Sequence, residues 1–565
     1  MTTRALFGRF IISASAVCLL LRAWPAGVPA SSIRFQEVAA QSGITAQMRC
    51  GGPEKKWIPE ANGSGAAWLD YDRDGQMDLL IVNGSTLDDL RQIVTGKVPP
   101  AREGSVYLYR NLGKGRFQDV TRQAGLSNPY WGTGVAVADF NNDGYPDILI
   151  TSIGLDLLFR NNGDGTFTDI TRTSGLSRKI AWHTGAAFGD YDGDGRLDFY
   201  VAGYLDLSVL KLDGPAPVCQ YRGISGFCGP LGLKGEADIL YHNNGDGTFT
   251  DVTEKAGVKD TGLYHGFTVV FDDFNQDGKI DIFVANDSDP NYLYLNQGNG
   301  VFKEAGLASG VAVSGDGRTQ SNMGVAVGDF DGDGLIDLLT TTFSEDYFPL
   351  FKQHTQGIFE DVSAQAGLIA PTQHWVGWAC GFADFDNDGH KDLWLANGHV
   401  YPNADGLPGT RYRQPIAVFT NRTGKFQPVQ GDPAWTAKGS YRGGCMGDFN
   451  NDGKIDIVAL PIAGTPLLLE NRTESQFHWI GFVLHGRVGN RDGIGALVRI
   501  ESCGSTQVES LRNGGSYLSH NDPRMHFGLG SCQKVDRVSI RWPGGRRQVI
   551  ENLGTDRYVT VDEPL

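Results

Sequence analysis

The chain has 565 residues, a hydrophobic content of 40% and a formal net charge of −16. This hydrophobic content is enough for a packed core, and the negative charge argues against nucleic acid as a partner. The 77 glycines are about twice the average share, which is typical of a fold with many tight turns.

The first 30 residues have the features of a signal peptide. Arg4 and Arg9 precede an apolar run at 10–21, and small residues at 28–30 offer a cleavage point before Ser31. The apolar run is too short for a typical membrane span, although a retained N-terminal anchor is the alternative. We therefore expect export to a secreted, periplasmic or cell-surface location, without a stable membrane span after cleavage.

One nine-residue pattern then recurs seven times, with Asp or Asn at its first, third, fifth and ninth positions and Gly at its sixth. Closely spaced oxygen ligands on a tight loop are what Ca²⁺ requires, and the glycine permits the sharp turn. We predict up to one Ca²⁺ in each copy. The predicted metal ligands are Asp70, Asp72, Asp74 and Asp78; Asp139, Asn141, Asp143 and Asp147; Asp190, Asp192, Asp194 and Asp198; Asp273, Asn275, Asp277 and Asp281; Asp329, Asp331, Asp333 and Asp337; Asp384, Asp386, Asp388 and Asp392; and Asp448, Asn450, Asp452 and Asp456.

The EF-hand begins with a similar pattern, but it needs a glutamate at the twelfth position and a helix on each side. The twelfth positions here are Ile81, Ile150, Val201, Val284, Thr340, Leu395 and Ala459. Short apolar runs such as 78–82 and 281–284 follow the loops and are typical of buried strands. The sequence therefore predicts a strand-loop-strand cation site that the ninth-position aspartate closes.

A second sequence motif alternates with the acidic loops. It occupies 109–121, 159–171 and 241–253, and less regular copies begin at Tyr294, Phe351 and Phe419. An aromatic strand end, an Asn-x-Gly turn and a strand that opens with Phe predict a β-hairpin. Each repeat thus supplies four antiparallel strands, which is one blade of a β-propeller.

We expect an all-β fold in which residues 31–472 form a seven-bladed β-propeller. The seventh repeat ends near 467–471 without its last strand, and residues 35–44 resemble that missing piece. The N-terminal strand would then complete the last blade and protect the sheet edges. Residues 473–565 contain no acidic loop, and alternating strands at 479–484 and 538–542 predict a separate small β domain.

These motifs resemble those of known families. The acidic loops resemble FG-GAP/VCBS repeats of integrin-type propellers. The segments 489–496, 515–519, 526–530 and 542–545 resemble the ASPIC/UnbV domain. The combination is similar to the cartilage-acidic-protein family. This resemblance implies a secreted, calcium-binding propeller with a role in adhesion or matrix interaction.

Export favours disulfide bonds, although the sequence leaves the connectivity open. Cys219 and Cys228 lie within the Gly/Pro-rich insertion at 205–236, and Cys503 and Cys532 lie in the C-terminal region. We expect these two pairs to form. Cys380 and Cys445 precede consecutive acidic loops, so neighbouring blades are expected to bring them together, and Cys50 is left over.

Aromatic and histidine side chains precede several of the acidic loops by six to ten residues and would lie at the opposite end of the inner strands. We favour packing between blades as their role, with sugar or peptide binding as the alternative. A ring of three of these histidines holding a transition metal is a further alternative. The candidates for this face are Trp131, Trp182, His183, His265, His374 and Trp375.

We therefore predict a secreted calcium-binding platform that contacts an extracellular protein or glycan. The sequence contains no serine-nucleophile, HExxH or P-loop motif, so we assign no catalytic residues. The alternative is an exported carbohydrate-active or oxidative enzyme with its site on the aromatic and histidine face.

Overall fold

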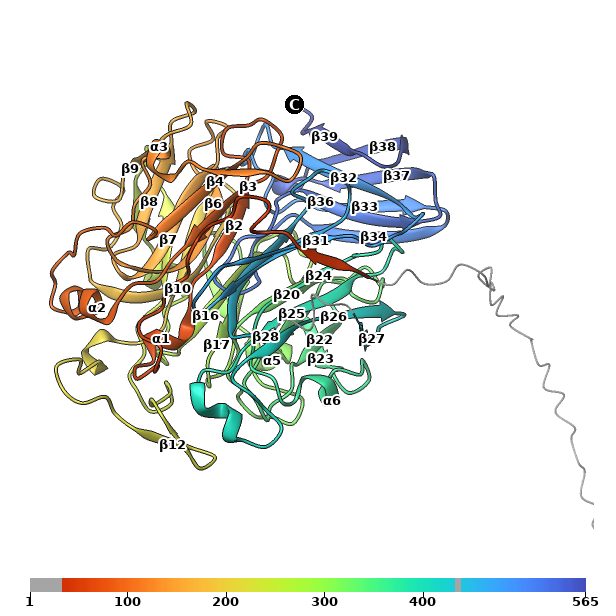
Figure 1. Ribbon diagram of the computed structural model, residues 1–565. Coiled ribbons are helices and arrows are strands. Elements are labelled where there is room, and N and C mark those ends of the chain that lie inside the picture. The colour runs from red at the N-terminus through yellow and green to blue at the C-terminus, as the bar shows by residue number, and fades with distance from the viewer. Residues whose placement is uncertain (1–32, 432–437) are drawn as a thin grey trace, which may run out of the picture. The chain divides into compact units, whose positions relative to one another are not determined.

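The structure, a computed structural model, describes residues 33–431 and 438–565. These residues belong to one unit, Ser32–Leu565, which is described by itself. The predicted signal peptide at 1–30 lies outside the described residues. The secondary structure is dominated by strands with a few short helices, so the predicted all-β class is confirmed (Figure 1).

Apart from a few short strands in the connections, the strands between 33 and 471 fall into seven sets of four antiparallel strands, one for each acidic loop, which we call sheets 1 to 7. Sheets 2 and 3 join into one eight-stranded sheet, because Trp182 pairs with Ile153 and Ala181 pairs with Gly154. In every sheet the acidic loop joins the first two strands, so no helix flanks it. Sheet 1 contains β2 (Ala66–Leu69), β3 (Asp78–Val82), β4 (Val106–Asn111) and β5 (Phe117–Asp119); sheet 2 contains β6 (Trp131–Ala138), β7 (Asp147–Gly154), β8 (Leu157–Asn161) and β9 (Phe167–Asp169); sheet 3 contains β10 (Ala181–Gly189), β11 (Asp198–Gly203), β14 (Ile239–Asn243) and β15 (Phe249–Asp251); sheet 4 contains β16 (Gly266–Asp272), β17 (Asp281–Asn286), β18 (Tyr292–Asn296) and β19 (Phe302–Glu304).

The remaining three sheets have the same order. Sheet 5 contains β20 (Val325–Gly328), β21 (Asp337–Thr340), β22 (Leu350–Thr355) and β23 (Ile358–Asp361); sheet 6 contains β24 (Gly377–Ala383), β25 (Asp392–Asn397), β26 (Gln414–Arg422) and β27 (Lys425–Pro428); sheet 7 contains β29 (Tyr441–Gly447), β30 (Asp456–Pro461), β31 (Leu467–Asn471) and β1 (Phe35–Glu37). Strand β28 (Lys438–Gly439) pairs with β26.

Strand β1 comes from the N-terminal end of the described chain and forms the edge of sheet 7. Phe35 lies opposite Asn471 in the register, and Glu37 lies opposite Leu469. Beyond the strand, the Val38 amide donates a hydrogen bond of 2.8 Å to the Leu468 carbonyl. The N-terminal strand β1 therefore completes the sheet of the last repeat, as the sequence predicts.

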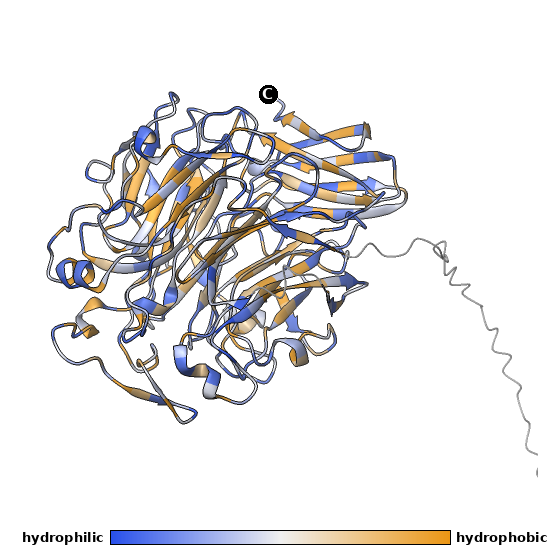
Figure 2. Ribbon diagram, viewed as in Figure 1, coloured by the Kyte–Doolittle hydropathy of each residue, from blue (hydrophilic) through white to orange (hydrophobic). Residues whose placement is uncertain are grey.

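Apolar side chains fill the space between neighbouring sheets. In β3, Leu80 belongs to one hydrophobic cluster and Ile81 to another, and both are 0% exposed. The second strand of each sheet is therefore buried on both faces, which explains its continuous apolar sequence. Figure 2 shows the same pattern as predominantly hydrophobic colouring along these strands.

The C-terminal region forms two further sheets around a core of its own. One contains β36 (Met525–Gly530), β32 (His478–His485) and β39 (Tyr558–Asp562), in which β32 and β39 are parallel; the other contains β34 (Ser505–Ser510), β33 (Leu497–Ser502), β37 (Lys534–Arg541) and β38 (Arg547–Gly554).

One part of this region lies among the first strands of the propeller sheets rather than in its own core. We call residues 513–520 the axial segment. Its β35 (Asn513–Gly514) pairs with β16, and Ser516 forms a bridge with Val325 of β20. Further along, the Val135 amide of β6 donates to the Leu518 carbonyl (3.1 Å), and the His520 amide donates to the Ala66 carbonyl of β2 (2.8 Å). The C-terminal region is therefore not independent of the propeller.

This close approach needs positions without a side chain. A Cβ atom added to Gly65 would lie 1.6 Å from the Leu518 carbonyl oxygen, and one added to Gly324 would lie 2.0 Å from the Trp378 carbonyl oxygen. Both glycines directly precede a first strand, so a larger residue at either position would separate main chains that are in contact. These glycines therefore allow the first strands to pack against the axial segment and against one another.

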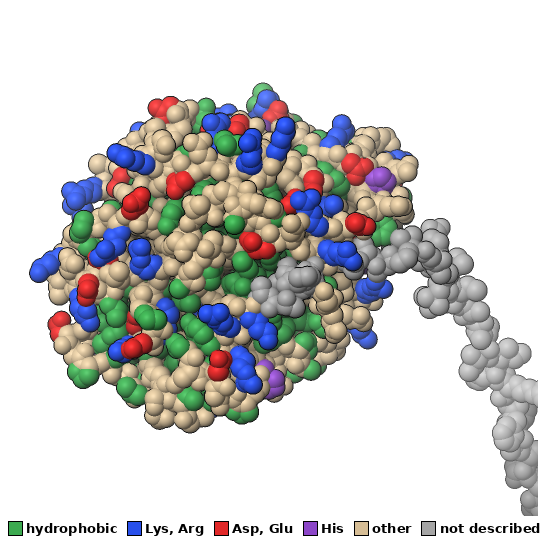
Figure 3. All heavy atoms as spheres, in the orientation of Figure 1, with side chains coloured by type: hydrophobic (Ala, Val, Ile, Leu, Met, Phe, Trp, Pro, Cys, Tyr) green, Lys and Arg blue, Asp and Glu red, His purple; other side chains and the backbone are tan. Residues whose placement is uncertain are grey.

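The helices are short and lie in the connections. They are α1 (Pro59–Asn62), α2 (Leu87–Val94), α3 (Thr121–Ala124), α4 (Thr253–Ala256), α5 (Gly306–Ser309) and α6 (Ile369–Thr372), with 3-10 turns at Leu207–Val209, Pro402–Gly406 and Pro543–Gly545. Within the part of the chain that the structure describes, no helix has the length and apolar character of a membrane span. On the face displayed in Figure 3, basic side chains are interspersed with acidic ones.

The insertion at 205–236 contains a small hairpin of β12 (Cys219–Tyr221) and β13 (Ile224–Gly226). Although it belongs to repeat 3, this hairpin contacts sheets 5 and 6. The Tyr401 hydroxyl donates to the Phe227 carbonyl (3.1 Å), and Arg222 forms an ion pair of 2.7 Å with Glu345.

Candidate cation-binding loops

In each acidic loop, the first-position aspartate accepts hydrogen bonds from main-chain amides of the same loop. In sheet 6, Asp384 Oδ1 accepts the Asp388 amide (3.0 Å), and its Oδ2 accepts the Gly389 amide (2.7 Å). Gly389 has a φ of 95°, a conformation that glycine adopts without strain. The first and sixth positions of the pattern therefore fix the turn that brings the other oxygens together.

The ninth-position aspartate joins the loop to the third strand of its own sheet. Asp392 Oδ2 accepts the Phe385 amide (3.1 Å), and Oδ1 accepts the Asn421 amide (2.9 Å). Equivalent pairs of bonds occur in all seven loops. A carboxylate oxygen accepts more than one bond, so this structural role is compatible with the predicted role as a metal ligand.

The three converging carboxylates of sheet 6 are all buried. Oxygens of Asp384, Asp386 and Asp392 lie within 4.8 Å of one another, and these residues are 2%, 5% and 2% exposed. Burial raises the pKa of both Asp384 and Asp392 well above the usual range of an aspartate, and the neighbouring carboxylates raise it further. A divalent cation would offset this cost, because it neutralises several anions at one point.

The other loops bring their acids together to different degrees. Groups of three carboxylates also form in sheets 1, 3 and 5. These groups are Asp70, Asp72 and Asp78; Asp190, Asp192 and Asp194; and Asp329, Asp331 and Asp333. The loops of sheets 2, 4 and 7 carry Asn141, Asn275 and Asn450 at the third position, where the ligand oxygen would be an amide oxygen.

In two loops a basic side chain from the third strand lies against the carboxylates. Arg110 Nη2 is 2.7 Å from Asp72 Oδ2 in sheet 1, and Lys352 Nζ is 2.6 Å from Asp333 Oδ2 in sheet 5. These ammonium and guanidinium groups lie close to the oxygens that a cation would use. Sheets 1 and 5 thus have a counter-ion from their third strand. In sheets 3 and 4 the basic residue lies within the loop itself, where Arg196 pairs with Asp194 and Lys279 pairs with Asp277.

In sheets 3 and 4, a histidine and an arginine from outside the loop lie close to the loop carboxylates. His242 Nδ1 lies 3.4 Å from Asp192 and 3.2 Å from Asp198, which gives sheet 3 a mixed histidine and carboxylate group. In sheet 4, Arg541 from the C-terminal region lies 2.6 Å from Asp273 Oδ2. By contrast, no lysine or arginine of the described residues forms an ion pair with the acidic-loop aspartates of sheets 2 and 7.

A repeated asparagine, which sequence reasoning read only as a turn residue, connects neighbouring sheets. Asn161 Nδ2 donates to the Tyr71 carbonyl of the preceding loop (2.9 Å) and to Pro146 (3.1 Å). Its Oδ1 accepts the Gly163 amide (3.0 Å). Equivalent links to the adjacent loop come from Asn111, Asn243, Asn296, Asn421 and Asn471.

The hydrogen bond of Asn111 shows that the first sheet lies next to the last, because Asn111 Nδ2 donates to the Phe449 carbonyl of sheet 7 (2.7 Å). Sheet 1 therefore contacts the last sheet in the same way that sheet 2 contacts sheet 1. The sequence signal was the recurrence of this asparagine two residues before a turn glycine in several repeats.

Comparison with known families matches both parts of the chain. The FG-GAP-like repeat model matches residues 88–150, 146–201 and 273–340, and the ASPIC and UnbV model matches residues 486–565. The chain carries FG-GAP-like repeats and an ASPIC and UnbV domain. The matched FG-GAP segments include the acidic loops of sheets 2, 3, 4 and 5, and the ASPIC and UnbV match includes the axial segment.

This FG-GAP repeat chain is related to cartilage acidic protein 1. It is 26% identical to the Homo sapiens protein over 391 residues, which is 66% of this chain and 52% of that protein. It is 24% identical to the Xenopus tropicalis protein over 369 residues, which is 63% of this chain and 51% of that protein. The chain spans about half the length of the curated relatives it matches.

Among solved structures, a lectin of Agrocybe aegerita that recognises non-reducing terminal N-acetylglucosamine is similar. The match has 18% identity and a TM-score of 0.37, and it covers 65% of this chain and 80% of that chain. A BBS1N structure in complex with ARL6DN gives 10% identity and a TM-score of 0.41, with 79% and 99% covered.

The aromatic and histidine candidates lie at the ends of the FG-GAP inner strands that are remote from the acidic loops. Trp131 and Trp182 are 1% and 0% exposed and belong to the main hydrophobic cluster. His183 and His265 are also buried, whereas His374 is exposed and Trp375 is half-buried. The structure therefore does not present these six side chains as one open surface.

Each of the three histidines has its own carboxylate neighbour. None of them belongs to a group of metal-binding side chains within the described residues. The pairs are His183 with Asp156 (2.5 Å), His265 with Asp289 (2.7 Å) and His374 with Glu345 (3.3 Å).

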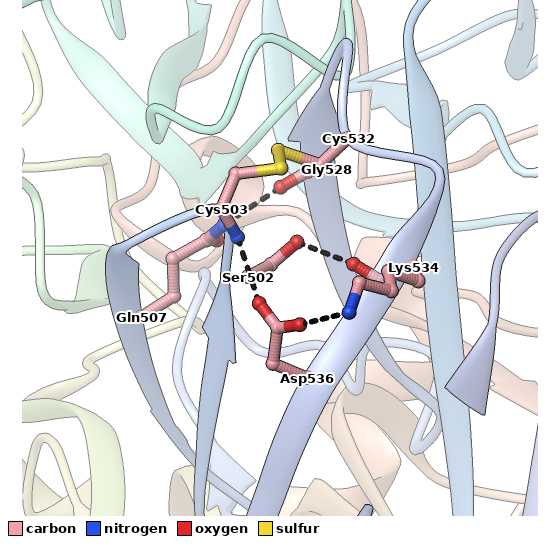
Figure 4. Close-up of a disulfide and its surroundings, with 7 residues drawn as sticks. All are labelled: Ser502, Cys503, Gln507, Gly528, Cys532, Lys534 and Asp536. Atoms are coloured by element: carbon pink, nitrogen blue, oxygen red, sulfur yellow. Dashed lines mark hydrogen bonds and ion pairs between the residues drawn. A yellow bond between two sulfur atoms is a disulfide. The ribbon is translucent and has the colours of Figure 1, made fainter. Parts of the chain in front are cut away.

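Both predicted disulfides are present. Cys219 joins Cys228 next to the β12–β13 hairpin, and Cys503 joins Cys532 in the ASPIC and UnbV domain. Figure 4 shows the second disulfide beside Asp536, whose Oδ2 accepts the Cys503 amide (3.2 Å).

The expected proximity of Cys380 and Cys445 as a pair is wrong, since both are free and buried. Cys380 packs in the hydrophobic cluster of sheets 5 and 6, whereas Cys445 packs in the cluster of sheets 7 and 1. Equivalent strand positions place the two thiols in different gaps between sheets. Cys50 is also free and buried.

Proposed function

We propose that this chain is an exported calcium-binding protein whose FG-GAP repeats form an interaction platform. The observation that supports calcium most directly is the sheet 6 loop, where Asp384, Asp386 and Asp392 converge while almost completely buried. Hard divalent cations prefer such clusters of carboxylate oxygens on a tight loop. Calcium binding to the folded chain would stabilise it, because the unfolded chain does not hold these oxygens together.

We expect the seven loops to differ in their affinity for calcium. We assign the highest affinity to sheet 6, and we expect binding in sheets 2 and 7, whose loop aspartates have no lysine or arginine ion pair among the described residues. Sheet 7 has a further carboxylate nearby, since Glu470 accepts a hydrogen bond from Asn450 (3.2 Å). Sheets 1 and 5 should bind calcium weakly, because Arg110 and Lys352 already neutralise their acids.

Several features support an extracellular setting. The two disulfides are typical of proteins that fold in an oxidising compartment, and the first 30 residues have the sequence of a signal peptide. The relatives are named cartilage acidic protein 1, which is compatible with a role in an extracellular matrix. We propose that the calcium-stabilised sheets present a rigid surface to an extracellular protein or glycan.

Calorimetric titration and thermal melting test the calcium part of the proposal. The calcium-free protein should take up Ca²⁺ with measurable heat, and a chelator should lower the melting temperature. Asp386→Ala should remove the tightest site, because it leaves no side-chain oxygen at the third position, whereas Asp213→Ala, which changes an exposed aspartate outside the loops, should leave the titration unchanged. A melting temperature that is the same with and without chelator would contradict the proposal.

A binding assay tests whether the protein contacts an extracellular partner. Immobilised protein should retain material from an extracellular matrix or envelope extract in the presence of calcium, and the chelator should release it. Equal retention by the wild type and by Asp386→Ala, with and without calcium, would show that the interaction does not depend on calcium binding.

A further inference from the structure

A cavity of about 780 Å³ lies between the acidic-loop ends of sheets 1, 2 and 7 and the C-terminal sheets. We call it the interdomain cavity and define it by Trp68, Val137, Val483, Arg491, His520 and Tyr558, which all line it. Its size is that of a pocket for a small organic molecule. The predicted metal ligands contribute to it only through Asp70 of the sheet 1 loop, so the cavity is largely separate from the proposed calcium sites.

Most of the cavity wall is apolar. Val137 and Ala138 come from β6, Val483 and Leu484 come from β32, and Ile494 comes from the loop between the C-terminal sheets. These side chains come from two parts of the chain that are far apart in the sequence and that meet only in the folded protein. The wall therefore suits the apolar body of a ligand.

Two buried side chains with ring nitrogens, Trp68 and His520, also line the cavity. Trp68 is 0% exposed, and its Nε1 has no hydrogen-bond partner among the described residues. His520 is 6% exposed, and no described residue forms a hydrogen bond with its ring. Burial lowers the pKa of His520 to about 4, so its ring is neutral near pH 7. Buried polar groups normally have partners, so these two suit a polar atom of a ligand.

The rim of the cavity is basic. Arg73, Arg491 and Arg557 line it and are exposed, and none of them is within ion-pair distance of a carboxylate among the described residues. Arg73 lies over the Tyr145 ring at 5.3 Å, and Arg491 donates to the Asn142 carbonyl at 3.4 Å.

The cavity also has acidic lining residues. They are Asp70, Asp492, which accepts the Asp139 amide (2.7 Å), and Asp556, which pairs with His478 (2.7 Å). The other lining arginines, Arg512 and Arg524, are paired with Asp272 and Asp522. The guanidinium groups that remain available are therefore those at the rim, where they match an anionic group.

We propose that the interdomain cavity binds one small amphipathic organic anion. Its apolar body lies between β6 and β32, its carboxylate, sulfate or phosphate group contacts Arg73 and Arg491, and a polar atom meets Trp68 Nε1. This site adjoins the proposed calcium loops of sheets 1 and 2, because Arg73 lies within the first loop and Arg491 contacts the second, but it takes a different ligand.

Fluorescence titration of the full chain with 1-anilinonaphthalene-8-sulfonate, in excess calcium, tests the site. This probe has an apolar body and one anionic group, and we expect saturable binding with one probe for each chain. The uncharged N-phenyl-1-naphthylamine should bind more weakly, because it lacks the group that contacts the arginines.

Variants locate the site. Val483→Trp fills the cavity and should abolish binding, whereas Val549→Trp, on an exposed part of β38 outside the cavity, should leave it unchanged. Arg73→Gln combined with Arg491→Gln should weaken sulfonate binding about tenfold or more, without weakening the uncharged probe. Arg116→Gln, an exposed arginine elsewhere, is the matched control.

Three results would overturn the proposal: no saturable binding, binding that survives Val483→Trp, or equal loss with the charged and the uncharged probe in the arginine variant. Melting curves and calcium titrations of each variant show that it is folded. Intact calcium binding without probe binding would reject the cavity alone and leave the calcium proposal standing.

Discussion

The hydroxyl group of Tyr517, in the axial segment, donates a hydrogen bond of 3.1 Å to the main-chain carbonyl of Asn62, 455 positions earlier in the chain. Tyr517 is 0% exposed, and its ring contacts those of Trp378 (4.9 Å) and Phe267 (5.4 Å). One residue of the C-terminal region thus joins sheets 4 and 6 to the connection before sheet 1. The stability of the propeller should therefore depend on a residue outside its repeats.

Tyr517→Ala should destabilise the whole described unit by about 3–5 kcal/mol, because it leaves a large cavity among buried rings. Tyr517→Phe should cost about 1 kcal/mol through the lost hydrogen bond, and Tyr145→Phe, which changes a half-buried tyrosine in a loop, should cost little. Urea unfolding followed by tryptophan fluorescence measures these differences. Two separate transitions, of which only the C-terminal one responds to Tyr517→Ala, would show that the parts are independent.

The repeated asparagine gives a second prediction. Asn161→Ala removes three hydrogen bonds at a position that is 1% exposed and leaves buried carbonyl and amide groups without partners. We expect a loss of about 3 kcal/mol in the free energy of unfolding. Asn162→Ala, at the adjacent exposed turn position, is the matched control and should cost less than about 1 kcal/mol. Similar losses for the two variants would mean that the link between sheets 1 and 2 contributes little.

Removal of the internal counter-ions should increase calcium binding. In Arg110→Ala and Lys352→Ala the carboxylates of sheets 1 and 5 lose the partners at 2.7 Å and 2.6 Å, so the unpaired acids should attract a cation more strongly. Calorimetry should then detect additional or tighter calcium sites. Arg160 holds the equivalent position in sheet 2 and forms no ion pair with another described residue, so Arg160→Ala should leave the number of sites unchanged. Fewer sites in Arg110→Ala would show that the arginine supports the loop instead of competing with calcium.

A buried histidine predicts a pH dependence of stability. His399 is 0% exposed, and burial together with the nearby Arg442 lowers its pKa to about 3. Because the folded state disfavours the protonated ring, this contribution is fully present above the unfolded pKa near 6.5 and is lost as the pH falls toward 3. At pH 5 the loss should be about 2 kcal/mol relative to pH 7.

His399→Asn keeps an acceptor near the position of Nδ1, which accepts the Tyr401 amide (3.1 Å), but it cannot be protonated in this range. Urea unfolding at pH 7 and pH 5, in excess calcium, should therefore show a smaller acid-induced loss in the variant than in the wild type. An equal loss in both proteins would assign the acid sensitivity to other groups, such as His520 and His526, whose pKa burial also lowers.

The sequence by itself determined the repeat unit, because its main signals are local. The nine-residue acidic pattern, the apolar run after it and the Asn-x-Gly hairpin all lie within one repeat, and they correctly placed the strands on either side of each loop. The pairing of β1 with β31 was also predictable, because the last repeat lacks the strand that residues 35–44 resemble. The two disulfides followed from short or intradomain separations.

Contacts between distant segments were decided only by the tertiary structure. No local pattern shows that residues 513–520 lie among the first strands of the propeller, that Cys380 and Cys445 lie in different gaps between sheets, or that Arg110 lies against Asp72. The interdomain cavity likewise exists only where β6 meets β32. Local hydrogen bonding and hydrophobic periodicity fix a strand and its turn, whereas these contacts depend on how complete sheets pack against one another.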